Sequence, residues 1–346
     1  MPTTDDRTPV FYHPDQLLFR PLVEWERGKE VAHPETPERL QRILEAVEAA
    51  SDRYELRTAP PLPARALDLH APGLLALYRA AERLSPGQQV LPTFFPGPDV
   101  PRRATVDHVG QWATDTHTPL GRQLWRTVQA SARAAAAAEA IRTAPLAYAA
   151  TRPPGHHATP ERFGGYCYLN HAALAARILG GRVTILDIDV HHGHGTQAFF
   201  ERDPHVQVVS VHEHPAFPWM TGHAAERGEG PGIGLNANLP QASGCDGPSY
   251  LGVLEGHVLP LIRCFEPDVL VISAGVDTHA SDPLGSFQLT THDLHAIGCA
   301  LGRLGRPTVV LQEGGYDLAT LGASVIALLD GLREGQSEVE WPIRTT

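Results

Sequence analysis

Apolar residues in the second half of the chain gather into short runs, many of them rich in valine and isoleucine. The runs cover residues 146–150, 183–188, 206–211, 269–273 and 308–311. Between several of them lie stretches with helical apolar spacing, at residues 172–179, 250–265 and 291–304. Continuous apolar strands alternating with helices are typical of a parallel sheet covered on both faces. The pattern predicts an α/β fold with a central, mostly parallel β-sheet flanked by helices.

The first 120 residues are rich in proline and less regular. Residues 37–50 have apolar positions at helical spacing, with Thr36 as a candidate N-cap and Pro37 at the first helical position. Residues 131–142 predict an alanine-rich helix. Residues 88–119 contain several aromatic side chains, which disordered segments usually lack, so we expect a long ordered loop there.

Each predicted strand of the second half is followed directly by unusual polar residues. Because open α/β sheets bind ligands outside the carboxyl ends of their strands, this edge of the sheet is the expected functional site. The segments that follow the five strands in chain order are residues 152–157 (RPPGHH), 187–193 (DIDVHHG), 212–214 (HEH), 274–277 (AGVD) and 312–316 (QEGGY).

The most informative of these segments is residues 187–193. Alternate residues of a strand point to one side, so Asp187, Asp189 and, where the extended geometry continues, His191 project together. Asp189, His191 and Asp277 together would supply three ligands of the type that zinc prefers and leave a fourth position open. That is the arrangement of a catalytic rather than a structural zinc site. The alternative is a solvated turn of aspartate and histidine after a strand.

A hydrolytic metal site also needs groups that move protons. His156 and His157 are adjacent and follow a Pro-Pro-Gly turn, which could hold both rings near the metal. Tyr316, after two glycines, could donate a hydrogen bond to a developing oxyanion. Taken singly, the histidine pair could be a surface turn and the tyrosine a core residue. Their joint placement at strand ends favours the catalytic interpretation.

Composition narrows the class of protein. The chain has 346 residues, of which 42% are hydrophobic and 19% charged, as in an ordinary globular protein, and we treat residues 1–346 as a single domain. The net charge of -11 argues against a nucleic-acid partner and is compatible with a cationic ligand. The four cysteines show no close pairing, the first seven residues lack a signal-peptide pattern, and no apolar run has membrane-spanning length. We therefore expect a cytoplasmic protein without membrane contact.

The chain resembles the zinc-dependent deacetylases. This family includes histone deacetylases and acetylpolyamine amidohydrolases and has the arginase-like α/β fold. Residues 91–96 (LPTFFP) and 112–119 (WATDTHTP) are most similar to the long N-terminal loop of acetylpolyamine amidohydrolases, whereas residues 33–39 (HPETPER) are also similar to the protein deacetylases. The motifs that carry the family resemblance are residues 152–158 (RPPGHHA), 164–170 (GGYCYLN), 187–193 (DIDVHHG), 275–278 (GVDT) and 313–316 (EGGY).

The resemblance implies a role for individual residues. Zinc would be bound by Asp189, His191 and Asp277, with His157 as the general base and Tyr316 as the oxyanion donor. His156, paired with Asp187, would be the electrostatic partner or the acid that protonates the departing amine. The narrow channel around the aliphatic stem of the substrate would be formed by Gly165, Tyr166 and Phe217.

The resemblance also implies a monovalent cation, usually potassium, behind the zinc. Its ligand positions correspond to Asp187, Asp189, His191, Ser210 and Val211. A second cation site would lie near Phe200, Asp203 and Val206. By the same resemblance, the enzyme is expected to be a homodimer.

One position departs from the family pattern. Where the family usually carries aspartate or asparagine to orient the second histidine of the pair, this chain has His194. A histidine can accept a hydrogen bond from His157 in one tautomer, but it can also become cationic and lower the basicity of His157. The substitution affects the expected pH dependence and leaves the metal ligands unchanged.

Three other functions remain open from the sequence. The substrate could be an acetyl-lysine side chain of a protein instead of an acetylated small amine such as an acetylpolyamine. A binuclear manganese hydrolase of the arginase type would need further carboxylates, of which Asp282 is the nearest. A non-catalytic acyl-amine binding module should have lost a metal ligand, a histidine of the pair or the tyrosine, and all six are present.

Overall fold

An eight-stranded sheet forms the centre of the molecule, and each strand is parallel to its neighbours. The computed structural model describes residues 6–26, 28–97 and 99–339, so part of the N-terminal stretch analysed above lies outside the described residues. The strands, in their order across the sheet, are β10 (Asn236–Gln241), β9 (Val206–Glu213), β8 (Val183–Asp187), β11 (Val269–Ala274), β12 (Thr308–Gln312), β7 (Leu146–Ala149), β1 (Thr8–Tyr12) and β4 (Tyr54–Thr58).

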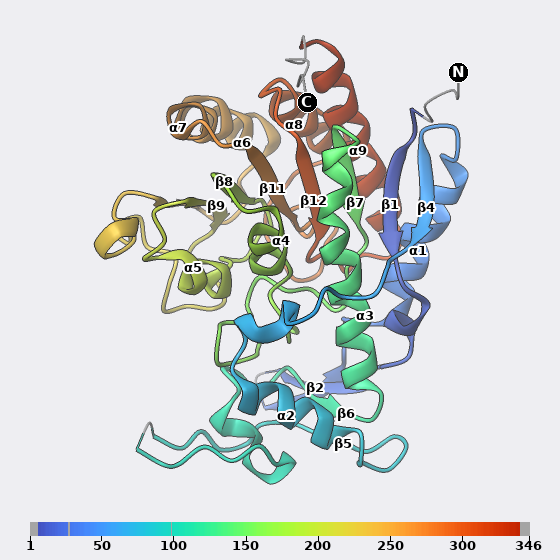
Figure 1. Ribbon diagram of the computed structural model, residues 1–346, viewed down its shortest axis with the longest axis vertical. Coiled ribbons are helices and arrows are strands. Elements are labelled where there is room, and N and C mark those ends of the chain that lie inside the picture. Colours follow the sequence, from blue (N-terminus) through green and yellow to red (C-terminus); the bar gives the residue numbers. More distant parts are fainter. Residues whose placement is uncertain (1–5, 27, 98, 340–346) are drawn as a thin grey trace.

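Helices cover both faces of this sheet, as Figure 1 shows. Alternate residues of one strand belong to different cores: Ile185 of β8 packs on the face covered by α2, α3 and α4, whereas Leu186 packs on the face covered by α1 and α6 to α9. The helices are α1 (Pro37–Ala49), α2 (Pro72–Ala81), α3 (Leu124–Ala136), α4 (His171–Leu179), α5 (His194–Phe200), α6 (Gly247–Val253), α7 (Leu259–Phe265), α8 (Thr291–Gly302) and α9 (Leu321–Ser337).

The predicted α/β class with a parallel central sheet is confirmed, and all five predicted strands are present. The helix boundaries differ in detail. The alanine-rich helix begins earlier, at Leu124, and continues past Ala136 as a 3₁₀-helix. The expected helix over residues 250–265 is α6 and α7 joined by a π-helical turn, Leu254–Val258. Helix α1 starts at Pro37 as expected, although the Thr36 side chain makes no capping hydrogen bond.

The interpretation of the N-terminal part as irregular was wrong in one respect: β1 and β4 extend the central sheet. Strand β1, with the sequence TPVFY, offers only a short apolar run, and β4, with the sequence YELRT, offers none. Strand β10, with the polar sequence NANLPQ, was missed for the same reason. Strands β4 and β10 lie at the two edges of the sheet, where a strand has one neighbour and a polar sequence is tolerated.

Two small antiparallel pairs lie beyond the central sheet. Strands β2 (Val23–Glu26) and β3 (Lys29–Ala32) form a hairpin, and β5 (Gln89–Val90) pairs with β6 (Leu120–Gly121). The second pair closes the base of the predicted loop over residues 88–119, which contains a 3₁₀-helix, Val106–Gln111. In Figure 1 these segments lie below the central sheet. Within the described part of the chain, no helix combines the length and the apolarity needed to cross a bilayer.

Candidate metal centre and catalytic pocket

The predicted metal ligands meet at the carboxyl edge of the sheet. His191 Nδ1 lies 3.0 Å from Asp189 Oδ1 and 3.3 Å from Asp277 Oδ2. One donor atom from each of the three residues lies within 4.8 Å of the other two. Asp277 follows β11, which is the neighbour of β8 in the sheet, so the sheet order brings it to Asp189 across 88 positions of sequence.

The local geometry that positions Asp189 and His191 differs from the expected extended strand. Strand β8 ends at Asp187, and the chain then continues through two tight turns. Asp187 Oδ1 accepts a hydrogen bond from the Asp189 amide at 3.1 Å, and Asp189 Oδ1 accepts one from the His191 amide at 2.8 Å. The two-residue spacing of Asp187, Asp189 and His191 therefore reflects turns closed by aspartate side chains, not the alternation of side chains along a strand.

The environment of this triad fits a divalent cation. The Asp189 and Asp277 carboxylates are almost completely buried, and Asp277 Oδ2 makes no hydrogen bond although His191 lies at ion-pair distance. Burial and the neighbouring charge of Asp189 raise the pKa of Asp277 to about 7. Two buried carboxylates at this separation repel each other unless a cation lies between them. Oxygen and imidazole nitrogen are donors that zinc prefers.

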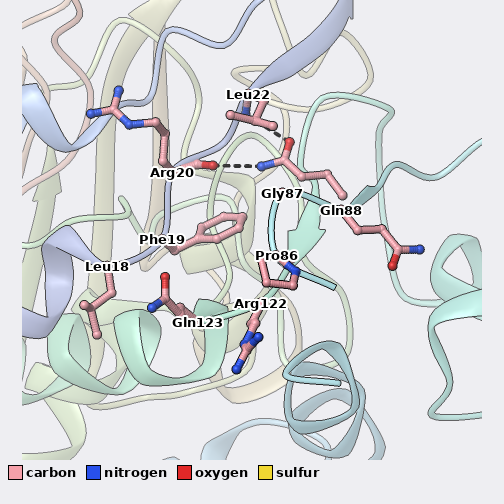
Figure 2. Close-up of a pocket in the computed structure, with 11 residues that line it drawn as sticks. Leu18, Phe19, Arg20, Leu22, Pro86, Gly87, Gln88, Arg122 and Gln123 are labelled. Atoms are coloured by element: carbon pink, nitrogen blue, oxygen red, sulfur yellow. Dashed lines mark hydrogen bonds between the residues drawn. The ribbon is translucent and has the colours of Figure 1, made fainter. Parts of the chain in front are cut away.

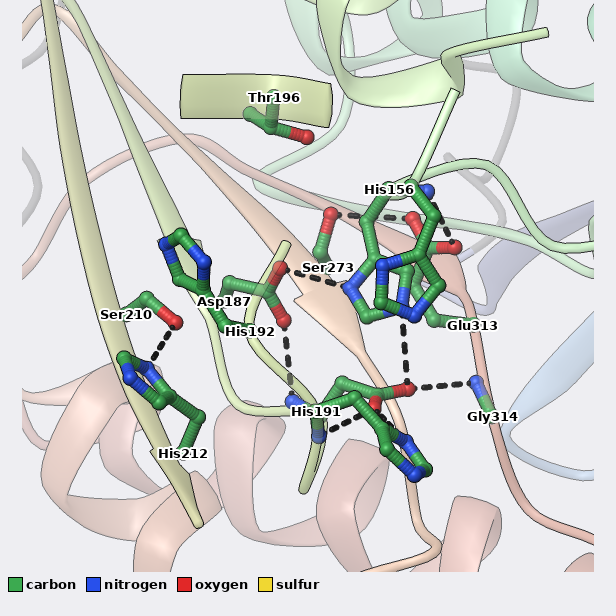
Figure 3. Close-up of polar contacts among 12 residues, drawn as sticks. His156, Asp187, His191, His192, Thr196, Ser210, His212, Ser273, Glu313 and Gly314 are labelled. Carbon is green, nitrogen blue, oxygen red and sulfur yellow. Dashed lines mark hydrogen bonds and ion pairs between the residues drawn. The ribbon is translucent and has the colours of Figure 1, made fainter. Parts of the chain in front are cut away.

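Next to the triad, His156 pairs with Asp187, as predicted (Figure 3). His156 Nδ1 lies 2.9 Å from Asp187 Oδ2, and both side chains are buried. Burial alone would lower the pKa of His156, but the carboxylates of Asp189 and Asp187 outweigh it and raise this pKa to about 10. His156 is therefore an imidazolium at neutral pH when no metal is bound.

The second histidine of the pair contacts the residue that departs from the family pattern. His157 Nδ1 lies 3.2 Å from His194 Nδ1. Only one of these two nitrogens can carry the shared proton, so one ring donates and the other accepts. Burial and the charge of His156 lower the pKa of His157 well below its usual value, and burial lowers that of His194 to about 4. When His157 Nδ1 donates, its Nε2 is free to accept a proton.

A pocket of about 190 Å³ leads from these histidines to the surface. Tyr166 and Phe217, the predicted channel residues, form its walls with Gly165, and Tyr316 lines it as well. The Phe217 ring stands perpendicular to the His157 ring, with the centroids 5.1 Å apart. The structure thus brings the predicted base, the predicted oxyanion donor and the predicted channel residues to one cavity.

Tyr316 is held in place from two sides. Asp282 Oδ2 accepts hydrogen bonds from the amides of Tyr316 at 2.6 Å and Asp317 at 3.2 Å, and the Arg39 guanidinium lies 4.4 Å from the centroid of the Tyr316 ring. Burial raises the pKa of the Tyr316 phenol well above its usual value, so the hydroxyl remains a donor at neutral pH. Asp282 therefore holds the backbone of the segment that carries Tyr316.

The sequence reasoning missed a buried carboxylate behind the histidine pair. Glu313 accepts hydrogen bonds from the amides of Gly155 at 2.6 Å and His156 at 3.1 Å and from the Ser273 hydroxyl at 3.1 Å (Figure 3). Burial raises the pKa of Glu313 to about 7. Its position directly after an apolar strand was the available signal. Glu313 fixes the loop that carries His156 and His157.

Three residues at the mouth of the pocket were also missed: Glu24, Glu26 and His117. Glu24 is buried and accepts a hydrogen bond from the Tyr166 hydroxyl at 2.8 Å, while His117 Nδ1 lies 3.4 Å from its carboxylate. Burial would raise the pKa of Glu24, but these partners outweigh it and lower the pKa below its usual value. Among the described residues of the predicted long loop, 88–119, His117 is the one that lines the pocket.

Two of the predicted cation positions are neighbours in the central sheet. Asp187 and Ser210 are partners in the β8–β9 register, and the Ser210 hydroxyl lies 2.8 Å from His212 Nδ1 (Figure 3). Val211 is the next residue of β9, and its side chain belongs to the apolar core. Elsewhere, the residues of the second predicted site, Phe200, Asp203 and Val206, line one hollow of about 530 Å³.

A separate hollow of about 320 Å³ lies beside the base of the loop over residues 88–119 (Figure 2). Gln89 spans it by donating to the Arg20 carbonyl at 2.8 Å and accepting from the Leu22 amide at 2.9 Å. These bonds hold the segment that leads into β2. Gln89 therefore helps to position the hairpin that carries Glu24. The residues that line this hollow include no histidine, aspartate or glutamate.

Comparison with known proteins agrees with the geometry of the site. Residues 33–332 match the histone deacetylase domain. An acetylpolyamine amidohydrolase of Burkholderia pseudomallei is 35% identical over 93% of this chain and 98% of its own length. Acetylpolyamine amidohydrolase 1 of Pseudomonas aeruginosa is 39% identical over 69% of this chain and 72% of its own. The crystal structure of the acetylpolyamine aminohydrolase from Burkholderia pseudomallei superposes with a TM-score of 0.89 at 34% identity, covering 95% of this chain and 99% of that one.

Proposed function

This chain belongs to the histone deacetylase family and is an amide hydrolase, and from that premise we propose that it removes a small acyl group from the terminal nitrogen of a cationic aliphatic amine. An acetylpolyamine is the substrate class that we favour. The observation that carries the proposal is a pocket of about 190 Å³ that is lined by His191 of the metal triad, by the histidine pair and by the carboxylates of Glu24 and Glu26.

Asp189, His191 and Asp277 are the residues that would hold zinc. Bound there, zinc would polarise the substrate carbonyl and lower the pKa of water, which supplies a nucleophile at neutral pH. The donor set fits, because two buried carboxylates and an imidazole converge and one carboxylate oxygen lacks a hydrogen bond.

The protein's own residues account for the proton movements. His157, neutral because its pKa is depressed, takes a proton from the attacking water at Nε2 while Nδ1 remains hydrogen-bonded to His194. His156, hydrogen-bonded to the Asp187 carboxylate, would donate a proton to the departing amine. The Tyr316 hydroxyl donates a hydrogen bond to the developing oxyanion.

The walls and the mouth of the pocket support a slender cationic substrate. Tyr166 and Phe217 would enclose the aliphatic stem, and Gly165 lies between them. Glu24 and Glu26 would attract an ammonium group at the other end of the molecule, and the lining residues of this pocket include no lysine or arginine. The side chain of an acetyl-lysine in a protein has the same reacting end. It is the second candidate and not the first, because it has no ammonium group at a fixed distance from the acetyl group.

Two of the earlier alternatives lose support. An arginase-type second metal would need Asp282, but that carboxylate accepts three backbone hydrogen bonds, from Leu284, Tyr316 and Asp317. A non-catalytic binding module has no reason to keep all six catalytic and metal-binding side chains in one place. Potassium at Asp187, Ser210 and Val211, a homodimer, a single domain and a cytoplasmic location stay predictions.

The decisive experiment is a deacylation screen with the purified, zinc-loaded chain. Acetylputrescine, acetylcadaverine and acetylspermidine are compared with acetyl-lysine peptides, and kcat/KM is measured for each. We expect kcat/KM to be higher for the acetylated amines. This preference should decrease as the salt concentration rises, because salt screens the attraction between the carboxylates at the mouth and the ammonium group. A higher kcat/KM for the peptides would favour the protein deacetylase, and no hydrolysis of either class would overturn the proposal.

A further inference from the structure

A second group of metal-binding side chains lies on the outer helices, away from the catalytic pocket. His295 and Cys299 are one helical turn apart on α8, and Glu334 lies on α9. One donor atom from each of the three lies within 4.8 Å of the others, in the same way as for the catalytic triad. None of them lines the catalytic pocket. The predicted function does not use them.

The distances are close to those of a metal site. Cys299 Sγ lies 3.6 Å from His295 Nδ1, and Glu334 Oε2 lies 3.3 Å from His295 Nε2. Bonds of about 2.0–2.3 Å to a tetrahedral zinc place neighbouring donor atoms roughly 3.3–3.8 Å apart. The two contacts use opposite nitrogens of the His295 ring, so binding of one metal requires the His295 and Glu334 side chains to rotate, and both are partly exposed to solvent.

The two helices hold these donors at a fixed separation. A Cβ atom at Gly331 would lie 2.1 Å from the His295 carbonyl oxygen, and one at Gly335 would lie 2.2 Å from that of Cys299. The backbones of α8 and α9 are therefore in direct contact beside the cluster, and α8 and α9 lie next to each other in Figure 1. Glu334, between these two glycines on α9, is placed opposite the histidine and the cysteine.

We propose that His295, Cys299 and Glu334 form a second divalent-metal site, of the zinc class, that links α8 to α9. Sulfur, imidazole nitrogen and carboxylate oxygen select zinc or a similar transition metal over magnesium and calcium, which prefer oxygen alone. Cys299 lies at the closed end of the site and Glu334 at the solvent side, so a water molecule can take the fourth position.

Binding at this site must release a proton. The bond between sulfur and metal replaces the S–H bond, and the proton goes to solvent. Burial and the charge of Glu334 raise the pKa of the Cys299 thiol; Arg303 acts against this shift and Glu338 reinforces it. His295 also has to be neutral to bind. Metal affinity is therefore expected to increase with pH.

Cobalt is the probe, because a bond between cobalt and a cysteine sulfur gives rise to a charge-transfer absorption. The catalytic triad offers only oxygen and nitrogen, so absorption from sulfur-to-cobalt charge transfer identifies a cysteine ligand. Cobalt is titrated into the zinc-loaded full chain, the absorption is recorded, and thermal unfolding is followed with and without the metal. We expect one equivalent to bind with this absorption and to raise the unfolding temperature. No such absorption in the wild type would overturn the proposal.

Variants assign the ligands. Cys299→Ser should abolish the absorption and the stabilisation, whereas Cys264→Ser, at an exposed cysteine of α7, should keep both. Glu334→Gln should weaken cobalt binding at least tenfold, because even the loss of an outer-shell partner commonly costs about 10–100-fold. His295→Gln repeats the test at a partly exposed position if Cys299→Ser does not fold. Absorption that persists in Cys299→Ser, or unchanged affinity in Glu334→Gln, would contradict the assignment.

Discussion

The metal centre and the rim of the pocket are built in different ways. At the metal centre the carboxylates are buried and held by backbone hydrogen bonds: Asp189 accepts from the amides of His191 and Gly314, Asp277 from the amide of Val190, and Glu313 from two amides and a hydroxyl. At the rim, Glu24 is buried and accepts a hydrogen bond from the Tyr166 hydroxyl, whereas Glu26 is exposed. The reacting groups are thus fixed by many contacts, while the residues that meet the rest of the substrate depend on few.

This difference predicts how substitutions will act. A change at the metal centre should abolish chemistry for every substrate, since it removes a ligand or a proton-transfer group. A change at the rim should alter which substrate is preferred and leave the chemical step intact. Each of the following experiments tests one side of that comparison.

The largest effect is expected from Asp277→Ala. It removes one of the three proposed metal ligands, so both zinc retention and hydrolysis of all substrates should be lost, and Asp189→Ala and His191→Ala should behave alike. Metal analysis of the purified variants measures this. Asp52→Ala, at an aspartate whose side chain is 70% exposed, is the control. Full zinc occupancy in Asp277→Ala would remove this residue from the coordination sphere.

The next largest effect is expected from Tyr316→Phe. Zinc content and substrate binding should be retained, but kcat should fall by about 10²–10³-fold, the typical loss for one oxyanion donor. Tyr250→Phe is a matched control, because the buried Tyr250 hydroxyl makes no hydrogen bond. If kcat in Tyr316→Phe stays near normal, the tyrosine is only part of the channel wall.

A smaller, substrate-dependent effect is expected from Glu24→Gln at the rim. Because the pKa of Glu24 is lowered, its carboxylate is charged at neutral pH and would attract the distal ammonium of a polyamine. KM for acetylspermidine should rise about tenfold, the size of one hydrogen bond between charged groups, while kcat changes little. The exposed Glu48→Gln on α1 is the control. An equal loss with acetyl-lysine peptides would show that the rim does not discriminate.

The smallest effect, a shift of the pH profile, is expected at His194. His157 must be neutral to accept a proton, so activity falls as pH drops through its pKa. A carboxylate in His194→Asp favours the protonated form of His157, raises its pKa and should move the acid limb of kcat/KM to higher pH. His194→Asn should leave a limb that titrates as a single group instead of a coupled pair. Superimposable profiles of all three enzymes would mean that something else orients His157.

The sequence alone determined the parts of the molecule that are encoded locally. Five strands were predictable because both faces of each are buried, and burial on both faces requires a continuous run of apolar residues. These strands are β7, β8, β9, β11 and β12. The meeting of the proposed metal ligands and the histidine pair at one edge of the sheet was predictable because polar residues that directly follow a buried strand have few structural reasons to be there. The contact between His157 and His194 was also predicted, and the structure places their nitrogens 3.2 Å apart.

Only the tertiary structure decided what those residues meet. The edge strands β4 and β10 carry mixed sequences, because an edge position tolerates polar residues, and the apolar pattern could not predict them. Glu24 lies on the β2–β3 hairpin and contacts Tyr166, which is 142 positions away in the sequence. No local sequence pattern predicts this contact. His295, Cys299 and Glu334 became a group through backbone contact between α8 and α9. Local sequence encodes burial and turns, whereas the partner of a side chain depends on which distant segments the sheet order brings together.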